Sequence, residues 1–334
     1  MRLSVALALL LALVLAFNLS TARADYAERE DVQAYIGELV AEHGFAKDTL
    51  QRLFNQAEKK QSILDAIARP AERTLKWHEY RKIFIKSSQF EPGLKFWRDN
   101  AKALARAETE YGVPARYIVA IIGVETRWGR VTGSYRVLDA LATLGFDYPP
   151  RSEFFRKELT EFLLLAREEQ SDPLELKGSY AGAMGFGQFI PSSFRAYAVD
   201  FDGDGKKDIW NNATDAIGSV ANYFKRHGWE GQGPVAAMVS MPVDAQAFAS
   251  LDALANETLE RTHTVGKLRD MGLFVADLAD AEQVALFRME QPGYAEYWLG
   301  LNDFYAITRY NHSRLYAMAV YQLGQVLQTA HDDG

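Results

Sequence analysis

Residues 114–130 read Pro-Ala-Arg-Tyr-Ile-Val-Ala-Ile-Ile-Gly-Val-Glu-Thr-Arg-Trp-Gly-Arg, an apolar run that leads to one acid, Glu125. Ile118, Ile121 and Ile122 precede this acid by seven, four and three residues. On a helix of 3.6 residues per turn, such spacing places the carboxylate on the stripe that faces the core. Burial disfavours the charged form of a carboxylate and raises its pKa, which suits a general acid that works near neutral pH. The run therefore predicts a buried helix with a candidate catalytic acid.

A purely structural role for Glu125 is the alternative that this helix alone leaves open. A buried glutamate can pair with Arg127 or Arg130 and serve only the fold, and paired structural carboxylates also have perturbed pKa values. Other segments of the chain have to decide between the two interpretations.

The first 24 residues have the features of a secretory signal peptide. Arg2 supplies a positive charge, residues 3–17 are almost wholly apolar, and Ala22-Arg-Ala24 forms a small-x-small cleavage pattern. An uncleaved membrane anchor is the alternative, but the apolar run is shorter than the ~20 residues that comfortably span a bilayer. Cysteine is absent, which excludes a lipid on an N-terminal cysteine and any disulfide. We expect a soluble periplasmic protein that begins at Asp25.

The charge balance argues against nucleic acid as a partner. Removal of residues 1–24 takes away Arg2 and Arg23 and no acid, so the net charge falls from −7 to −9. With 334 residues, 48% of them hydrophobic, the chain can bury a substantial core. A globular enzyme of one large or two smaller domains is expected.

Periodicity predicts a mainly α protein of the α+β class. Apolar positions recur at three- and four-residue spacing in residues 32–41, 48–57, 94–111, 114–128, 152–170, 215–227 and 313–329. Pro114 suits a first helical position and Gly129 a helix end. Gly-Gln-Gly-Pro at 231–234 interrupts this pattern, and β-prone runs follow at 235–243, 284–289 and 304–310, with a weak helix between them. We therefore expect a helical lobe of about residues 25–230 and 312–334, with a smaller mixed lobe of about 231–311 inserted before the last helix.

A glycine-rich stretch, Ser179-Tyr-Ala-Gly-Ala-Met-Gly-Phe-Gly-Gln-Phe-Ile-Pro-Ser-Ser193, is the second informative segment. A dinucleotide-binding loop is excluded because Ile190 stands where its fingerprint requires glycine, and no Gly-Lys-Ser/Thr lies nearby. Small residues interleaved with aromatic rings and neutral polar groups suit a sugar ring. Tight packing between helices is an equally good interpretation of this stretch on its own.

The segment Asp200-Phe-Asp202-Gly-Asp204-Gly205-Lys-Lys-Asp208 resembles an EF-hand calcium loop. Carboxylates stand at positions 1, 3, 5 and 9, glycine stands at position 6, and Lys206 offers its carbonyl from position 7. Position 12 is Asn211 instead of the usual glutamate, and Asp215 could close the metal shell. A solvated acidic turn is the alternative. The six histidines are scattered and no His-Glu-x-x-His occurs, so zinc chemistry has no support. We predict a structural Ca²⁺ and no organic cofactor.

Four blocks in order resemble the B-type lytic murein transglycosylases of glycoside hydrolase family 103. These are Gly-Val-Glu125-Thr-Arg-Trp-Gly, Ala-Gly-Ala-Met-Gly-Phe-Gly-Gln188-Phe, the acidic loop with Asp215-Ala-Ile-Gly-Ser-Val-Ala-Asn-Tyr223-Phe, and Thr308-Arg-Tyr310-Asn311-His-Ser. The resemblance extends over about residues 30–330. It implies a lysozyme-like helical catalytic lobe and makes the glycine-rich stretch part of a sugar cleft.

The resemblance also implies a reaction. Such enzymes cleave the β-1,4 bond between N-acetylmuramic acid and N-acetylglucosamine in peptidoglycan without water, because the muramoyl C6 hydroxyl attacks its own anomeric carbon and leaves a 1,6-anhydro end. Ordinary glycosidases need two carboxylates, whereas this intramolecular attack needs one. Glu125 would first protonate the leaving oxygen and then accept the C6 hydroxyl proton.

Matched motif by motif, the resemblance implies a set of substrate-binding residues: Tyr80, Ser179, Gln188, Tyr223, Tyr310, Asn311 and Tyr316. Arg151 would contact the peptide stem of the substrate, where its guanidinium could hold a carboxylate. The family can carry two adjacent arginines there, and this chain has Pro150-Arg151, which predicts weaker affinity for the stem. We expect a monomer that acts on peptidoglycan glycan strands, with proteins of cell-wall synthesis or turnover as candidate partners.

Two other functions stay open from the sequence. A hydrolytic muramidase would need a second carboxylate near Glu125, and Asp139 and Glu153 are the nearest in the sequence. A catalytically silent peptidoglycan-binding protein would keep the aromatic residues and lose the acid, which the presence of Glu125 disfavours.

Overall fold

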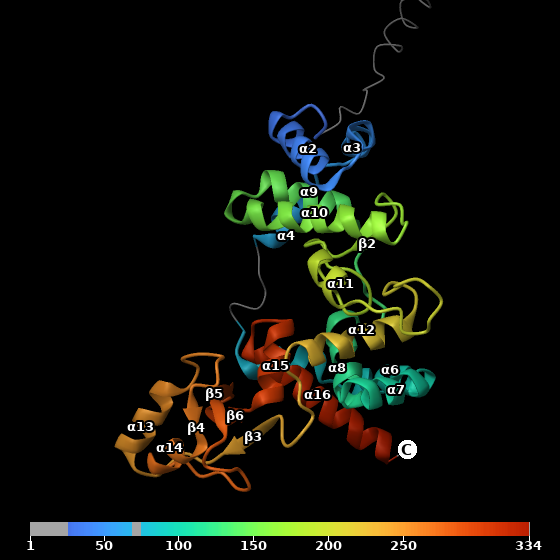
Figure 1. The fold of residues 1–334 in the computed structure, drawn as a ribbon. Coiled ribbons are helices and arrows are strands. Elements are labelled where there is room, and N and C mark those ends of the chain that lie inside the picture. Colours follow the sequence, from blue (N-terminus) through green and yellow to red (C-terminus); the bar gives the residue numbers. More distant parts are fainter. Residues whose placement is uncertain (1–25, 69–74, 334) are drawn as a thin grey trace, which may run out of the picture.

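The computed structural model describes residues 26–68 and 75–333 (Figure 1). The predicted signal segment, residues 1–24, lies outside these ranges. Within them, the structure contains no helix that combines the length and the apolar character needed to cross a membrane.

The described chain before residue 230 is mostly helical. Its elements are α2 (Glu30–His43), α3 (Lys47–Phe54), α4 (Gln61–Ile67), α5 (Trp77–Phe84), α6 (Ser87–Asp99), α7 (Ala101–Tyr111), α8 (Ala115–Thr126), β1 (Tyr135–Arg136), α9 (Val137–Asp147), the 3₁₀ helix η2 (Pro149–Arg151), α10 (Ser152–Glu168), β2 (Lys177–Gly178), α11 (Pro191–Tyr197) and α12 (Ala213–Arg226). The two-residue strands β1 and β2 pair antiparallel.

A smaller lobe and two more helices complete the chain. The later elements are β3 (Ala236–Val239), α13 (Ala245–Leu254), β4 (His263–Thr264), α14 (Val265–Asp270), β5 (Gln283–Gln291), β6 (Tyr294–Gly300), α15 (Asn302–Tyr310) and α16 (Arg314–Asp332). The last two return to the helical part, where α16 packs against α5, α6 and α8. The observed class is mainly helical with small antiparallel sheets, as predicted.

Helix α8 lies at the centre of the large core. Every one of its residues except Arg116 and Glu125 is buried, so the helix is enclosed on all sides rather than along one stripe. Gly324 of α16 lets the two helices approach closely, since a Cβ there would lie 3.2 Å from the Arg116 carbonyl oxygen. Enclosure of this kind explains why the apolar run before Glu125 has few polar interruptions.

The upper lobe in Figure 1 is a helical layer whose buried residues form one core with those of α8. Helices α2 and α3 lie above the antiparallel pair α9 and α10, and α11 lies between that pair and α12. Glu158 of α10 fixes α11 in place, because its carboxylate accepts hydrogen bonds from the Ser192 backbone N–H at 2.9 Å and from the Ser192 hydroxyl at 2.8 Å. This contact joins the upper lobe to the end of the glycine-rich stretch.

The small lobe is built on an antiparallel sheet with the strand order β3-β6-β5-β4. Along β5, Val284 and Leu286 face a core shared with α13 and α14, whereas Phe287 and Met289 belong to the large core. Alternation with a period of two is expected for a strand whose two faces are both covered. The sheet therefore forms the boundary between two cores.

The structure differs from the predicted local elements at five points. Residues 304–310, predicted as a strand, belong to α15, because Phe304, Ile307 and Thr308 are buried together at helical spacing on one face. Strand β6 was not predicted. The helix predicted over 94–111 is divided at Asn100, whose backbone leaves the helical region. Pro114 is the residue before α8 rather than its first residue, and α8 ends at Thr126, before Gly129.

Gly123 on α8 generates a prediction about packing. A Cβ at this position would lie 2.6 Å from the indole ring of Trp128, and that indole donates a hydrogen bond to the Val119 carbonyl at 3.0 Å. We expect Gly123→Ala to reduce the free energy of unfolding by about 1–3 kcal/mol, the usual cost of overpacking. Gly37→Ala in α2 is the matched control, because nothing lies within 4 Å of its added Cβ; it should be neutral or stabilise by up to about 1 kcal/mol. Denaturant unfolding measures both, and equal stabilities would contradict this packing.

Candidate active site

Glu125 lies half-buried in the last turn of α8, at the open end of an otherwise buried helix. The Tyr316 hydroxyl donates a hydrogen bond of 2.5 Å to its Oε1. Tyr316 is in the first turn of α16, where the Ser313 hydroxyl caps the helix by accepting the Tyr316 backbone N–H at 3.3 Å. The position of the acid is thus set by two helices, and the two residues in contact, Glu125 and Tyr316, are 191 residues apart in sequence.

A group of tyrosines extends from this contact. The rings of Tyr310 and Tyr316 are nearly parallel, with centroids 6.5 Å apart and 11° between their planes. Tyr223 lies edge-on to Tyr310 at 4.7 Å, and Phe189 lies 5.9 Å from the same ring. Burial, followed by the charge of Glu125, raises the pKa of Tyr310 and of Tyr316 well above the usual value. Both hydroxyls therefore stay protonated and act as hydrogen-bond donors.

The glycine-rich stretch packs against these tyrosines. The Tyr310 hydroxyl donates to the Gly187 carbonyl at 2.5 Å, and a Cβ at Gly187 would lie 2.8 Å from that hydroxyl oxygen. Glycine is therefore needed there for close approach. Gln188 follows with φ of 50°, an uncommon value for a residue with a side chain, and its amide donates to the carbonyls of Thr132 and Gly185 at 3.1 and 2.9 Å. The Ser179 hydroxyl accepts the N–H groups of Ala181 and Ala183.

Thr126 connects α8 to this stretch, and the sequence analysis did not identify this role. Its buried hydroxyl lies 2.9 Å from the Phe186 carbonyl and 3.1 Å from the Ile122 carbonyl, and it accepts the Gly129 N–H at 3.0 Å. One hydroxyl carries one proton, so it can donate to only one of the two carbonyls at a time. Its only signal in the sequence was its position directly after Glu125.

The other predicted substrate residues differ in their surroundings. Tyr80 of α5 is buried and close enough to Tyr316 to contribute to the raised pKa of that hydroxyl. Asn311 is the residue that ends α15, directly after Tyr310. Arg151 is exposed in η2, where its guanidinium lies over the Phe154 ring at 4.3 Å. The contacts above thus link Glu125, Tyr316, Tyr310 and Tyr223, and Tyr310 also holds the backbone directly before Gln188. The contacts of Ser179 lie within the glycine-rich stretch, and those of Arg151 lie outside this group.

Neither acid considered as a second catalytic group is available for that role. Asp139 is buried in α9, where its two oxygens accept hydrogen bonds from the Arg136 guanidinium at 2.8 and 2.9 Å and from the Glu58 N–H at 2.9 Å. Glu153 is exposed on α10 and pairs with Lys157 at 2.8 Å. Both carboxylates serve local contacts in the upper lobe.

A second stacking contact supports Tyr223. The His227 ring lies parallel to it, with centroids 3.9 Å apart and 19° between the planes, and the Tyr223 hydroxyl donates to the Arg309 carbonyl at 2.5 Å. Burial lowers the pKa of His227, which keeps the imidazole neutral against the ring. A histidine four residues after the tyrosine on one helix face was the available sequence signal.

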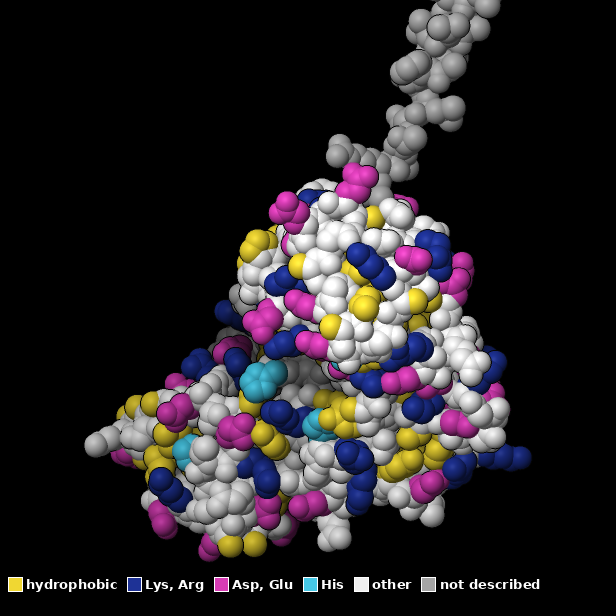
Figure 2. All heavy atoms as spheres, turned by 45° about the horizontal axis from the view of Figure 1, so that its top comes forward, with side chains coloured by type: hydrophobic (Ala, Val, Ile, Leu, Met, Phe, Trp, Pro, Cys, Tyr) yellow, Lys and Arg dark blue, Asp and Glu magenta, His cyan; other side chains and the backbone are white. Residues whose placement is uncertain are grey.

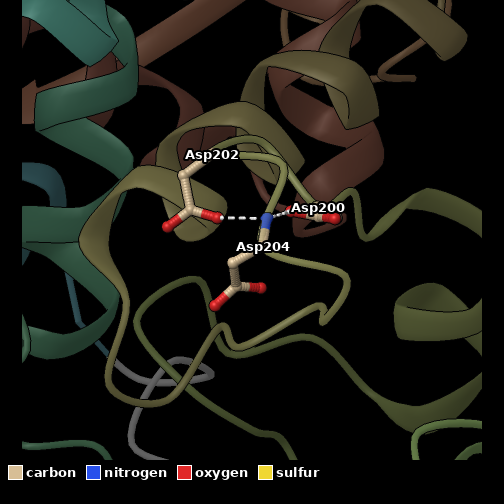
Figure 3. Close-up of side chains that lie close together, drawn as sticks. All are labelled: Asp200, Asp202 and Asp204. Carbon is tan, nitrogen blue, oxygen red and sulfur yellow. Dashed lines mark hydrogen bonds between the residues drawn. The ribbon is translucent and has the colours of Figure 1, made fainter.

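The acidic loop brings three carboxylates together. One oxygen from each of Asp200, Asp202 and Asp204 lies within 4.8 Å of the others (Figure 3). The Asp204 N–H points between Asp200 and Asp202, at 3.1 Å from an oxygen of each. Hydrogen bonds from the backbone N–H groups of Gly205, Gly203 and Asp204 lower the pKa of Asp200, so its carboxylate stays charged. Three hard oxygen donors at this separation fit a divalent cation such as Ca²⁺.

Asp208 and Asp215 lie outside that group of three. Asp215 is buried, and its oxygens accept the backbone N–H groups of Phe201 at 2.7 Å and Asp208 at 2.8 Å. Asp208 accepts the N–H groups of Trp210 and Asn211 at 2.9 Å. In this arrangement the two carboxylates hold the loop in shape from both of its ends.

Figure 2 shows the surface hollowed below the upper lobe, beside the small lobe. A substrate bound there would contact elements from both sides of the molecule. Tyr223, Tyr310 and Tyr316 belong to α12, α15 and α16, and the glycine-rich stretch is mostly the loop between β2 and α11.

Comparison with known proteins gives consistent matches over nearly the whole chain. A family model described as a transglycosylase SLT domain matches residues 27–325. The chain is 46% identical over 316 residues to the membrane-bound lytic murein transglycosylase B of Escherichia coli (strain K12), covering 92% of this chain and 85% of the relative.

Two solved structures show the same fold. The catenated lytic transglycosylase SltB1 from Pseudomonas aeruginosa has a TM-score of 0.87 and 55% identity, covering 92% of this chain and 100% of the other. The Escherichia coli lytic transglycosylase Slt35 in complex with calcium has a TM-score of 0.83 and 46% identity, covering 92% and 96%.

The contacts of Thr126 generate the second prediction. Thr126→Val keeps the shape of the side chain but leaves the Gly129 N–H and the Phe186 carbonyl without this partner. We expect a loss of about 1–3 kcal/mol in the free energy of unfolding and faster hydrogen exchange at the Gly129 amide. Thr126→Ser, the matched control, keeps the hydroxyl and should preserve the protection of that amide. Unchanged exchange in the valine variant would show that the hydroxyl does not hold the two segments together.

Proposed function

Because the chain belongs to the family of lytic murein transglycosylases with a transglycosylase SLT domain, we propose that Glu125 is the single acid and base of this enzyme. The observation that carries the proposal is the contact at 2.5 Å between its carboxylate and the Tyr316 hydroxyl, within a group of buried tyrosines. The two acids that a hydrolytic mechanism could have recruited, Asp139 and Glu153, are engaged elsewhere. A catalytically silent peptidoglycan-binding protein would not need a carboxylate positioned by a tyrosine hydroxyl.

The enzyme cleaves the β-1,4 bond between N-acetylmuramic acid and N-acetylglucosamine in peptidoglycan and forms a 1,6-anhydromuramoyl product. Glu125 gives its proton to the leaving glycosidic oxygen as that bond to the anomeric carbon breaks. The resulting carboxylate then accepts the proton of the C6 hydroxyl while O6 forms its bond to the same carbon. The proton balance closes, and Glu125 ends each cycle protonated. Because the nucleophile is part of the substrate, much of the entropic cost of bringing the groups together is avoided.

Tyr316 has a definite task in this cycle. Its pKa is well above the usual value, so it donates and does not compete with Glu125 for protons. A hydrogen bond to a charged acceptor is stronger than one to a neutral acceptor. Tyr316 therefore stabilises Glu125 most in the interval when the acid has lost its proton.

The surrounding residues would bind the glycan. Flat faces of Tyr223, Tyr310 and Tyr80 suit sugar rings, and the polar groups of Ser179, Gln188 and Asn311 suit hydroxyl and acetamido groups. Arg151, exposed on the upper lobe, would contact the peptide stem.

We also propose a structural calcium ion in the acidic loop. Asp200, Asp202 and Asp204 would supply side-chain oxygens and Lys206 its carbonyl, whereas Asp208 and Asp215 would hold the loop backbone. The calcium complex of the related Slt35 supports this assignment. The loop leads directly into α12, the helix that carries Tyr223, so the ion would steady one wall of the site.

For the cellular setting, we propose export to the periplasm, cleavage near Ala24 and a soluble monomer formed by residues 25–334. The helical lobe would comprise about residues 25–230 and 312–334, and the smaller lobe about 231–311. Proteins of cell-wall synthesis or turnover remain the candidate partners.

The reaction predicts a product that carries no oxygen from water. Digestion of purified peptidoglycan in heavy-oxygen water should give muropeptides with unlabelled 1,6-anhydro ends, because the C6 hydroxyl displaces the glycosidic oxygen within one molecule. Mass spectrometry distinguishes these ends from labelled reducing ends. Labelled reducing ends as the main product would make this enzyme a hydrolase.

The control for that experiment is Glu125→Gln, which keeps the shape of the side chain and removes its transferable proton. We expect turnover to fall at least about 10²-fold with the fold intact. Near-normal turnover in this variant would show that another group is the catalyst.

The calcium proposal predicts a thermal shift. An ion that binds only the native state stabilises it by mass action, by about 2.7 kcal/mol at a concentration one hundred times its Kd. Calcium should therefore raise the melting temperature of the metal-free protein, and a chelator should reverse the rise. Asp200→Asn with Asp204→Asn should abolish the response, whereas Asp270→Asn, at an exposed position outside the loop, should keep it. If calcium leaves the melting temperature of the metal-free protein unchanged, the assignment is wrong.

A further inference from the structure

A second cavity, of about 570 Å³, lies between the two lobes beside the start of α16. Residues 256–259 and Phe287 line it from the small lobe, and residues 312–315 line it from the turn between α15 and α16. None of the functions assigned above uses this cavity. Its walls come from both lobes, and its apolar lining side chains all belong to the large core or pack against it, so its shape depends on the two lobes being in place.

The small-lobe wall of the cavity is held firmly. The Asn256 side chain accepts the Arg288 backbone N–H at 3.0 Å and donates to the Arg288 carbonyl at 3.3 Å, while its own N–H donates to the Leu286 carbonyl at 3.0 Å. Asn256 has φ of 70°, a value that asparagine tolerates better than most residues. Hydrogen bonds to the backbone of β5 therefore fix the position of Asn256, as in a strand paired with β5.

Arg314 gives the cavity an unused donor. Its Nε is buried and has no hydrogen-bond partner in the described structure. Guanidinium groups bind carboxylates through two parallel N–H bonds, which makes a carboxylate the natural ligand of an uncommitted arginine edge. Glu257 is exposed on the wall of the cavity that the small lobe supplies, and its negative charge would repel a bound carboxylate.

The cavity shares one helical turn with the catalytic site. Arg314 and Tyr316 are two residues apart at the start of α16, so they project to different sides of it. Tyr316 contacts Glu125, and Arg314 lines the cavity. A substrate cleaved at Glu125 could therefore place a side branch in the cavity without leaving the glycan site.

We propose that this cavity binds the peptide stem of a muramoyl residue other than the one whose stem would contact Arg151, and that Arg314 turns to hold a carboxylate of that second stem. The inference rests on the proposed function. In the substrate, the sugar rings are neutral and the peptide stem carries free carboxylates. An arginine in the cavity therefore binds the stem in preference to the sugar rings. Leu75, Leu259, Phe287 and Leu315 give the cavity apolar walls suited to the alkyl parts of a short peptide.

The test compares peptidoglycan strands that carry stems with strands from which an amidase has removed them. On stem-bearing strands, Arg314→Gln should raise KM about tenfold, as expected for the loss of one charge-assisted contact, and should leave kcat nearly unchanged. Glu257→Gln should act in the opposite direction and lower KM up to about threefold, because it removes an exposed charge that repels the carboxylate. Neither substitution should change KM on stripped strands.

Arg98→Gln, at an exposed arginine on α6 paired with Glu91, serves as the matched control and should change neither value. An equal rise in KM on both kinds of strand, or no rise at all, for Arg314→Gln would overturn the proposal. So would an unchanged or higher KM for Glu257→Gln, a test that does not depend on the arginine variant folding. Failure of the wild-type protein to form anhydro products from either strand would instead count against the proposed function.

Discussion

The enclosure of α8 is the constraint on which the rest of the structure depends. A helix buried on every side can carry a charged group only where it reaches an opening, and Glu125 lies at its last turn. The helices around α8 have to supply both the apolar contacts along its length and the polar contact at its end. Helix α16 does both, because it packs along α8 and presents Tyr316 to the acid. The position of the proposed catalytic acid and the core therefore result from the same packing.

The remaining parts of the site are fastened to one another by backbone contacts. Tyr310 holds the Gly187 carbonyl, Tyr223 holds the Arg309 carbonyl, and Thr126 bridges the end of α8 to the Phe186 region. Side chains that bind main-chain atoms fix the path of the chain more firmly than contacts between two flexible side chains would. A site held in this way is largely formed before its substrate arrives, which suits a reaction whose main requirement is orientation.

The sequence revealed the features that are local and missed those that depend on neighbours distant in the chain. The acid, the glycine-rich stretch and the acidic loop each lie within a short segment whose residue types indicate their chemistry, so they could be recognised without a fold. The β-prone side chains of residues 304–310 predict a strand, but burial of Phe304 and Ile307 on one face favours a helix. Apart from the place of Thr126 directly after Glu125, Thr126 and Arg314 carry no local signal, because the roles of both depend on groups about 60 residues away. For Arg151 the difficulty is a different one. The motif predicts a contact with the peptide stem, but that contact depends on the position of the bound substrate.

The sheet of the small lobe has an evolutionary consequence. Because Val284 and Leu286 pack with α13 and α14 while Phe287 and Met289 pack into the large core, neighbouring positions of one strand have separate partners. Substitutions at one set can be compensated only within the small lobe, and those at the other only within the helical part. In a set of relatives, odd and even positions of this strand should therefore vary independently of each other, each in step with its own side of the sheet.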